Sequence, residues 1–255
     1  MRSEEIGDRG PATGDSGSKA APTPTSQIPT ATPQSPTTAA FSSLLTPHSS
    51  PPQSFAIIPA AGRSVRMGRP KLLLPWGKHT VIEELLAAWR GSRVSQVIMT
   101  VHPDDVDLAR LGASAGAEIV KVDPPPADMK ASVLAGLDYV ESKQRPGANA
   151  AWLLAPADMP LLTAKLIDRL LAAWQQNLFR NRQEILALSR DGRRGHPVLF
   201  PWAIVAAARR LPADAGLNQL LDDFGCRELA VDEDAAFVDL DTPADYQRWR
   251  DSPAM

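Results

Sequence analysis

Residues 55–71 read FAIIPAAGRSVRMGRPK, an apolar run that leads directly into a loop of small and basic residues. The run 55–58 has the length and composition of a buried strand, and a glycine-containing loop ends it. Open α/β sheets bind their ligands just beyond the carboxyl ends of such strands. The spacing is neither that of the dinucleotide fingerprint Gly-x-Gly-x-x-Gly nor that of a P-loop. The stretch therefore predicts an α/β fold with a ligand-binding loop after its first strand.

The loop carries residue types that suit a nucleotide. Its small residues, which let a flat base or a phosphate approach the backbone, are Ala60, Ala61 and Gly62. Gly68 can supply a further turn that exposes N–H groups to an anion. Arg66 offers a forked donor and Lys71 a point charge, and both suit a polyphosphate. An ordinary basic surface loop is the alternative interpretation.

Downstream of this loop, apolar runs of strand length alternate with segments of helical spacing. Strands are expected at 96–101, 118–122 and 151–155, and helices at 81–90, 104–115, 132–140 and 163–176. Thr80 is placed to cap the first of these helices. The alternation predicts a mainly parallel, Rossmann-like sheet with helices on both faces.

The later part of the chain is less regular. Strands are expected at 184–189, 197–200 and 237–240, and helices at 202–211, 217–222 and 242–249. The first two strands and the polar turn between them predict a hairpin inserted in, or appended to, a single α/β domain. This domain is expected to span residues 54–255.

The first 53 residues form a separate region, rich in Ser, Thr, Pro, Ala and Gly. Such a composition cannot bury enough apolar surface to offset the entropy of the chain, so we predict a disordered tail over residues 1–53. A docking or targeting role for this tail is the alternative.

The bulk properties exclude several classes of protein. With 27 basic and 29 acidic residues the net charge is −2, which gives no basic field for nucleic acid or an anionic membrane. Cys226 is the only cysteine, so an internal disulfide and a multi-cysteine metal site are excluded, and a structural role is favoured over a nucleophilic one. The absence of a long apolar run or a secretory signal predicts a cytoplasmic protein.

Two acidic stretches are candidate metal sites. Asp158 directly follows the apolar strand expected at 151–155, and a carboxylate at a strand end can hold Mg²⁺. Taken alone, an aspartate there is more often a turn residue. Residues 238–245 read VDLDTPAD and offer Asp239 and Asp241, of which either could bind a metal while the other caps a helix.

Residues 60–74 read AAGRSVRMGRPKLLL and resemble the opening motif of MobA-like nucleotidyltransferases, closest within them to molybdenum cofactor cytidylyltransferases. The resemblance covers about residues 55–250 and implies a fold of the nucleotide-diphospho-sugar transferase type. In that family the loop, which here includes Ser64, binds the nucleoside triphosphate. The Ala-Ala-Gly form is associated with CTP and the Ala-Gly-Gly form with GTP. The resemblance thus implies CTP here, with GTP as the alternative.

The resemblance also assigns the acidic residues. Asp158 matches the metal-binding aspartate of the family's Gly-Asp-x-Pro motif, although Ala157 replaces the glycine. The family's Asp-Ile-Asp-Thr-Pro ending favours Asp239 as the second Mg²⁺ ligand, with Asp241 as the alternate.

Two further segments resemble family motifs on the nucleotide and acceptor sides. His196, in GHPVLF, matches a segment near the acceptor, although a simple turn histidine is an equal alternative. Ser132 is retained from a Gly-Met-Ser-x-Ser segment and is expected to contact the nucleotide. Asp128 and Lys130 depart from that segment, which puts the exact substrate preference in doubt.

The resemblance implies in-line attack by an acceptor phosphate oxygen on the α-phosphorus of CTP, with Arg66 and Lys71 stabilising the departing pyrophosphate. The implied acceptor is the molybdopterin-type molybdenum cofactor, a client molybdoenzyme is a candidate partner, and no nucleic acid is expected. One alternative is a nucleotidyltransferase that acts on a sugar phosphate or another phosphate acceptor. A second is a non-catalytic nucleotide- or cofactor-binding protein.

Overall fold

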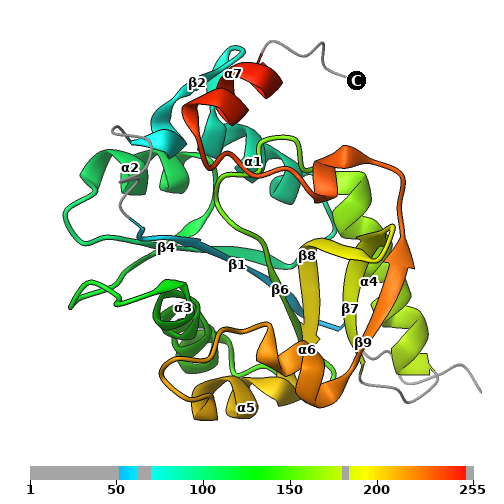
Figure 1. The fold of residues 1–255 in the computed structure, drawn as a ribbon. Helices are drawn as coiled ribbons and strands as arrows, with labels where there is room; N and C mark the ends of the chain where they lie inside the picture. The colour runs from blue at the N-terminus through cyan, green and yellow to red at the C-terminus, as the bar shows by residue number, and fades with distance from the viewer. Residues whose placement is uncertain (1–51, 63–69, 180–183, 251–255) are drawn as a thin grey trace, which may run out of the picture. The chain divides into compact units, whose positions relative to one another are not determined.

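The computed structural model describes residues 52–62, 70–179 and 184–250, which all belong to the unit spanning residues 48–255. A seven-stranded sheet forms the centre of this unit (Figure 1). In spatial order its strands are β5 (Glu118–Lys121), β4 (Gln96–Val101), β1 (Ser54–Ala60), β6 (Ala151–Leu154), β8 (Arg193–Pro201), β7 (Ile185–Arg190) and β9 (Cys226–Ala230). Within this sheet β8 alone runs antiparallel to its neighbours. The predicted α/β fold with a mainly parallel sheet is therefore confirmed.

Helices cover both faces of the sheet (Figure 1). One layer contains α1 (Val81–Arg90), α2 (Val106–Ser114), α4 (Ala164–Phe179) and α7 (Pro243–Arg250). The other contains α3 (Met129–Gln144), α5 (Val205–Arg210) and α6 (Gln219–Phe224). Residues of β1 alternate between the two cores: Phe55 and Ile57 pack on the α3 side, and Ala56 and Ile58 on the α1 side. Alternation of this kind is why a sheet covered on both faces has continuously apolar strands.

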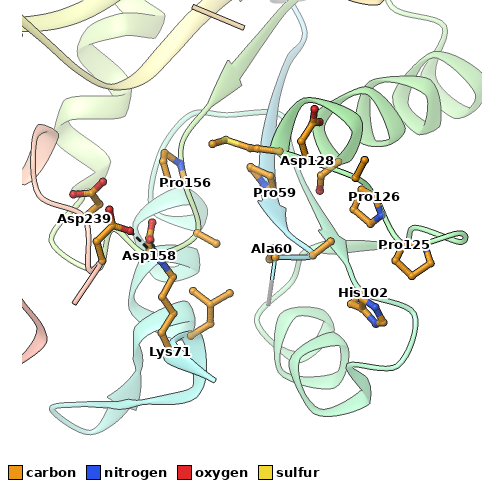
Figure 2. A pocket seen from close by; sticks show the side chains of 18 residues that line it. Pro59, Ala60, Lys71, His102, Pro125, Pro126, Asp128, Pro156, Asp158 and Asp239 are labelled. Atoms are coloured by element: carbon orange, nitrogen blue, oxygen red, sulfur yellow. Dashed lines mark hydrogen bonds and ion pairs between the residues drawn. The ribbon is translucent and has the colours of Figure 1, made fainter. Parts of the chain in front are cut away.

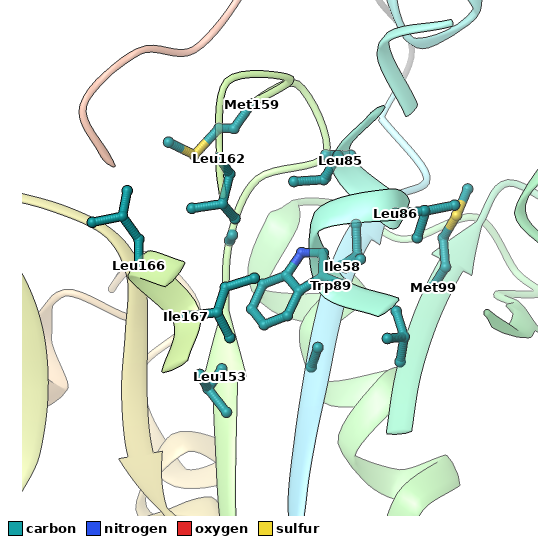
Figure 3. Close-up of a cluster of buried hydrophobic side chains, with 14 of the residues drawn as sticks. Ile58, Leu85, Leu86, Trp89, Met99, Leu153, Met159, Leu162, Leu166 and Ile167 are labelled. Atoms are coloured by element: carbon teal, nitrogen blue, oxygen red, sulfur yellow. The ribbon is translucent and has the colours of Figure 1, made fainter. Parts of the chain in front are cut away.

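Helix α1 shows how the sequence builds one of these layers. Thr80 Oγ1 accepts the backbone N–H of Glu83 at 3.4 Å, and the Glu83 carboxylate accepts the N–H of Thr80 at 2.8 Å. This reciprocal capping box satisfies two donors at the helix start. The buried residues follow helical spacing and are Val81, Ile82, Leu85, Leu86 and Trp89. The fully buried ring of Trp89 lies within the core cluster between α1 and the sheet (Figure 3).

Most of the predicted elements are present with shifted ends. Helix α3 extends beyond both ends of the range 132–140, and the range 202–211 divides into a 3₁₀ turn (Trp202–Ile204) and α5. The predicted hairpin is formed by β7 and β8, and it extends the central sheet beyond β6. The hairpin therefore widens the seven-stranded sheet and does not form a separate unit.

The strand predicted over 237–240 is wrong. A 3₁₀ helix (Asp234–Ala236) leads instead into irregular backbone, where Phe237 and Leu240 are buried because they pack into the core. Strand β9 was not predicted, because its mostly exposed residues lack an apolar alternation; it lies at the edge of the sheet, parallel to β7. A short hairpin of β2 (Pro75–Trp76) and β3 (His79–Thr80) was also missed.

The predicted disordered tail falls outside the described residues, except for residues 52 and 53, and remains a prediction. In the part of the chain that the structure describes, every helix is too short or too polar to cross a membrane.

Candidate active site

A cavity of about 690 Å³ opens at the carboxyl ends of β1, β4 and β6 (Figure 2). Three of its lining residues directly end or follow these strands: Ala60 ends β1, His102 follows β4, and Asp158 lies just after β6. Because these strands are parallel, their carboxyl ends meet at one edge of the sheet, which is where α/β proteins bind ligands. The cavity thus collects side chains that lie far apart in the sequence.

The wall formed by the end of β1 is flat and small. Ala60 and Ala61 are buried yet line the cavity, and a Cβ atom built on Gly62 would meet no atom of the described residues within 4 Å. Ser132, in the first turn of α3, also lines the cavity, and its Oγ lies 2.7 Å from Oγ1 of Thr100. The structure therefore brings together four of the predicted nucleotide-binding residues.

Four further predicted site residues belong to the loop after β1 or to its end. Ser64, Arg66 and Gly68 lie in the range 63–69, outside the described residues. Lys71 is described, at the start of a 3₁₀ helix (Lys71–Leu73), and it lines the cavity. The roles of the first three remain predictions from the motif.

Lys71 and Asp158 form the charged end of the cavity. The ammonium of Lys71 donates to Asp158 Oδ2 and to the carbonyl of Leu240 at 3.3 Å, and it lies 3.6 Å from Asp241 Oδ1. Asp158 is buried, and its Oδ1 has no hydrogen-bond partner among the described residues. A buried carboxylate oxygen without a partner is costly, so this atom is suited to receive a ligand.

The second acidic segment lies beside Asp158 (Figure 2). The backbone N–H of Leu240 donates to the carbonyl of Asp158 at 3.1 Å, which fixes the segment against the turn after β6. Asp239 lines the cavity and makes no hydrogen bond with another described residue. Asp241 also lines the cavity, but it is paired with Lys71. This difference supports Asp239 over Asp241 as the more available carboxylate.

The carboxylates at the cavity are few for a metal site. In the described ranges, no three His, Cys, Asp or Glu side chains are grouped so that they could hold a metal ion by themselves. Mg²⁺ in phosphate sites needs only one or two protein carboxylates, because phosphates and water supply the other oxygens. Asp158, whose Oδ1 has no partner in the ranges that the structure describes, and Asp239 fit that requirement.

His196 lies on β8, and it does not line the cavity. Its Nδ1 is 3.4 Å from the carbonyl of Leu154. Burial lowers the pKa of His196 below 6.5, although the Leu154 carbonyl and the charges of Asp239 and Asp158 act in the opposite direction. The ring is therefore neutral at neutral pH, and its role toward an acceptor remains a prediction.

His102 was missed by the sequence analysis. It is buried, it lines the cavity, and its Nδ1 accepts the backbone N–H of Asp104 at 3.2 Å. In the neutral ring the proton is therefore on Nε2, which is then a hydrogen-bond donor. The sequence could have indicated His102, because it directly follows the strand predicted at 96–101. Asp158 was selected because it follows a predicted strand in the same way.

The two departures from the nucleotide-side motif have structural roles. Asp128 Oδ1 accepts the N–H of Ala131 at 2.7 Å and caps α3. The Lys130 ammonium donates to three backbone carbonyls of one loop, those of Pro212, Ala213 and Ala215. Lys130 thus ties that loop to the start of α3.

Solved structures identify the class of the fold. A nucleotidyl transferase from Methanothermobacter thermautotroptrophicus, 22% identical, superposes with a TM-score of 0.63 over 78% of this chain and 96% of that chain. Rv0371c from Mycobacterium tuberculosis, in a crystal structure of its complex with manganese, is 27% identical with a TM-score of 0.61 over 79% of this chain and all of that chain. The fold is therefore that of the nucleotidyltransferases.

The family follows from the sequence comparison: residues 56–231 match the MobA-like NTP transferase domain, and the chain belongs to that family of nucleotidyltransferases. Among curated relatives, the molybdenum cofactor guanylyltransferase of Xanthomonas euvesicatoria is 29% identical over 75% of this chain and 92% of its own length. The molybdenum cofactor cytidylyltransferase of Escherichia coli is 27% identical over 74% and 92%. The 2-C-methyl-D-erythritol 4-phosphate cytidylyltransferase of Pectobacterium atrosepticum is 36% identical over 50% and 54%.

Proposed function

We propose that this protein transfers CMP from CTP to the molybdopterin-type molybdenum cofactor and releases pyrophosphate. The observation that carries the proposal is the buried Oδ1 of Asp158, which has no hydrogen-bond partner among the described residues and lies in one cavity with Asp239 and the small residues at the end of β1. Relatives that act on the molybdenum cofactor, and that this chain covers over most of their length, support the choice of acceptor.

In this proposal Asp158 and Asp239 hold Mg²⁺, which would neutralise charge on the phosphates of the nucleotide. The manganese complex of Rv0371c supports a divalent ion in this fold. Asp158 is the stronger of the two predicted ligands, because its Oδ1 is already buried and lacks a partner in the described part of the chain.

The remaining residues act by positioning and charge. An oxygen of the acceptor phosphate attacks the α-phosphorus of CTP, and the bond from that phosphorus to the β-phosphate oxygen breaks. Lys71 lies at the cavity wall where it can neutralise the departing pyrophosphate, and Arg66 is proposed to assist it. No general base is needed, because the acceptor phosphate is already ionised. The protein then contributes mainly the alignment of the two substrates.

The choice of CTP over GTP rests on the Ala-Ala-Gly form of residues 60–62. Relatives of both nucleotide preferences are similar to this chain, so the nucleotide is tested directly. Purified protein would be incubated with Mg²⁺, molybdenum-loaded molybdopterin and either CTP or GTP, and pyrophosphate release measured. CTP-dependent release is expected, and it should be lost in Asp158→Ala. A preference for GTP would overturn the nucleotide assignment.

A second candidate function is the transfer of CMP to another phosphate-bearing alcohol. The erythritol-phosphate cytidylyltransferase of Pectobacterium, similar over half of this chain, favours it. The two functions are separated by competition: excess methylerythritol phosphate should leave release from molybdopterin unchanged if the first proposal holds. Tight CTP binding without turnover on either acceptor would instead indicate a non-catalytic binding protein. Cytoplasmic location and a client molybdoenzyme belong to the same proposal.

A further inference from the structure

The segment that carries Asp239 lacks the support of a strand. Residues 237–240 have irregular backbone and no ladder partner, yet Asp239 must lie within reach of the same ligand as Asp158. A carboxylate on irregular backbone keeps its position only if other contacts fix that backbone. In this chain the contacts come from the β7–β8 hairpin.

Two arginines of the hairpin hold Phe237. Arg193 donates from Nη2 to the carbonyl of Phe237 at 3.1 Å, and its guanidinium lies 5.8 Å from the centre of the Phe237 ring. Arg190 lies over the same ring at 4.8 Å, and it donates to the carbonyl of Asp232 at 2.9 Å and to Asp234 Oδ1 at 2.7 Å. Cation–π contacts and charge-assisted hydrogen bonds thus fix both the side chain and the backbone.

Gly195 lets the segment lie directly on the backbone of β8. A Cβ atom at this position would be 2.4 Å from the carbonyl oxygen of Ala236 and 2.8 Å from Cε1 of Phe237. The first of these is a backbone atom, so any side chain larger than hydrogen must displace the segment. The contact is close enough to set the position of Phe237.

The other end of the segment is also fixed. Leu240 is 1% exposed, and its N–H donates to the carbonyl of Asp158 at 3.1 Å. Only Val238 and Asp239 lie between the fixed residues Phe237 and Leu240. Any displacement of Phe237 is therefore transmitted over two residues to the Asp239 carboxylate.

We propose that Gly195, Arg190 and Arg193 are positioning residues, which hold Phe237 and thereby fix the Asp239 carboxylate beside Asp158. The inference rests on the proposed function, since it takes Asp239 as a ligand of the divalent ion. Groups that orient a metal ligand typically contribute about 10- to 100-fold to metal affinity. The hairpin, which only widens the sheet in the fold, is on this view a support of the active site.

The first test uses two glycine variants. Gly195→Ala should displace the segment, while Gly147→Ala is the matched control, because a Cβ there would meet no atom within 4 Å. Mn²⁺ affinity would be measured by electron paramagnetic resonance in the presence of a non-hydrolysable CTP analogue. Gly195→Ala should bind Mn²⁺ about tenfold more weakly, or worse, and Gly147→Ala like the unmodified protein.

A second pair covers the case in which Gly195→Ala does not fold. Arg193→Gln removes the hydrogen bond to Phe237, and Arg194→Gln removes an equal charge from the next residue, which instead pairs with Glu228 at 2.9 Å. Arg193→Gln should weaken Mn²⁺ binding, Arg193→Lys should restore part of it, and Arg194→Gln should not change it. A merely structural role would lower Tm without this selective loss of Mn²⁺ affinity.

Asp239→Ala distinguishes the metal-binding role of Asp239 from the positioning role of the hairpin residues. If Asp239→Ala binds Mn²⁺ as well as the unmodified protein, the metal assignment in the proposed function fails. If Asp239→Ala binds it weakly while Gly195→Ala and Arg193→Gln, both folded, bind it normally, the positioning role is overturned. If all three lose affinity and the controls do not, both are supported.

Discussion

The two halves of the central sheet supply the cavity in different ways. In the parallel half, β5-β4-β1-β6, cavity residues such as Ala60, His102 and Asp158 end or closely follow their strands. In the other half, β8-β7-β9, no strand ends in a cavity residue, and Asp239 comes from irregular backbone beyond β9. In the first half the position of a site residue follows from the strand before it. In the second it depends on contacts between distant segments.

The greatest loss of stability is expected from a substitution in the core of the parallel half. Trp89→Ala should lower the free energy of unfolding by about 3–5 kcal/mol, because it leaves a large cavity in a fully buried cluster. Chemical denaturation followed by circular dichroism would measure it. Trp249→Ala, at a partly buried tryptophan that packs against the same cluster, is the control and should cost less. Equal losses would contradict the view that α1 anchors this half.

The next prediction concerns turnover at the proposed active site, in a protein that stays folded. Asp158→Asn keeps the shape of the side chain but removes its charge, so turnover should fall about 100-fold, or more, and the protein should stay folded although the ion pair with Lys71 is lost. Pyrophosphate release and a denaturation curve on the same sample would measure both. A protein that keeps full turnover would remove Asp158 from the proposed metal site.

Much of the parallel half could be predicted from the sequence, because its signals are local. The apolar run before Gly62, the Thr80 cap and the apolar run before Asp158 each indicate an element from neighbouring residues alone. Strand β4 and helix α1 have the predicted bounds. His102 shows that the same rule could have found one more cavity residue.

The other half could not be predicted in the same way. Phe237, Val238 and Leu240 form a short apolar run of strand length, but the burial of Phe237 and Leu240 comes from packing against the hairpin and the turn at Asp158. Strand β9 was missed because an edge strand with exposed residues has no alternation to detect. The functions of Arg190 and Arg193 in holding Phe237 depend on pairing that no local pattern encodes.

A smaller effect is expected at the start of helix α1. Thr80→Ala removes the side-chain half of the capping box and should lower the free energy of unfolding by about 1 kcal/mol. Turnover should stay the same, because no cavity residue depends on this cap. Thr80→Ser, which retains the hydroxyl, is the control. If Thr80→Ala lost turnover and Thr80→Ser did not, the cap of α1 would be needed to position residues of the cavity.

The smallest effect is a pH dependence in the antiparallel strand. Burial lowers the pKa of His196 in the folded state below its unfolded value of 6.5. Between the two values the unfolded chain binds more protons, so the stability present above pH 6.5 is lost as the pH falls toward the folded pKa. His196→Gln should therefore flatten the decline of Tm below pH 6.5. If Tm of His196→Gln declined with pH as steeply as that of the unmodified protein, other titratable groups would cause the decline.

The order of the site residues along the chain has a consequence for synthesis. Asp158 and the three strands whose carboxyl ends form the cavity, β1, β4 and β6, precede residue 160, whereas Asp239 and its supporting residues lie between residues 190 and 240. Because synthesis proceeds from the N-terminus, residues 54–160 emerge from the ribosome before the hairpin and the second carboxylate have been made. Under the proposed function the metal site is completed only after residue 240 has emerged, so a shorter nascent chain would lack the second carboxylate and could not turn over its substrates.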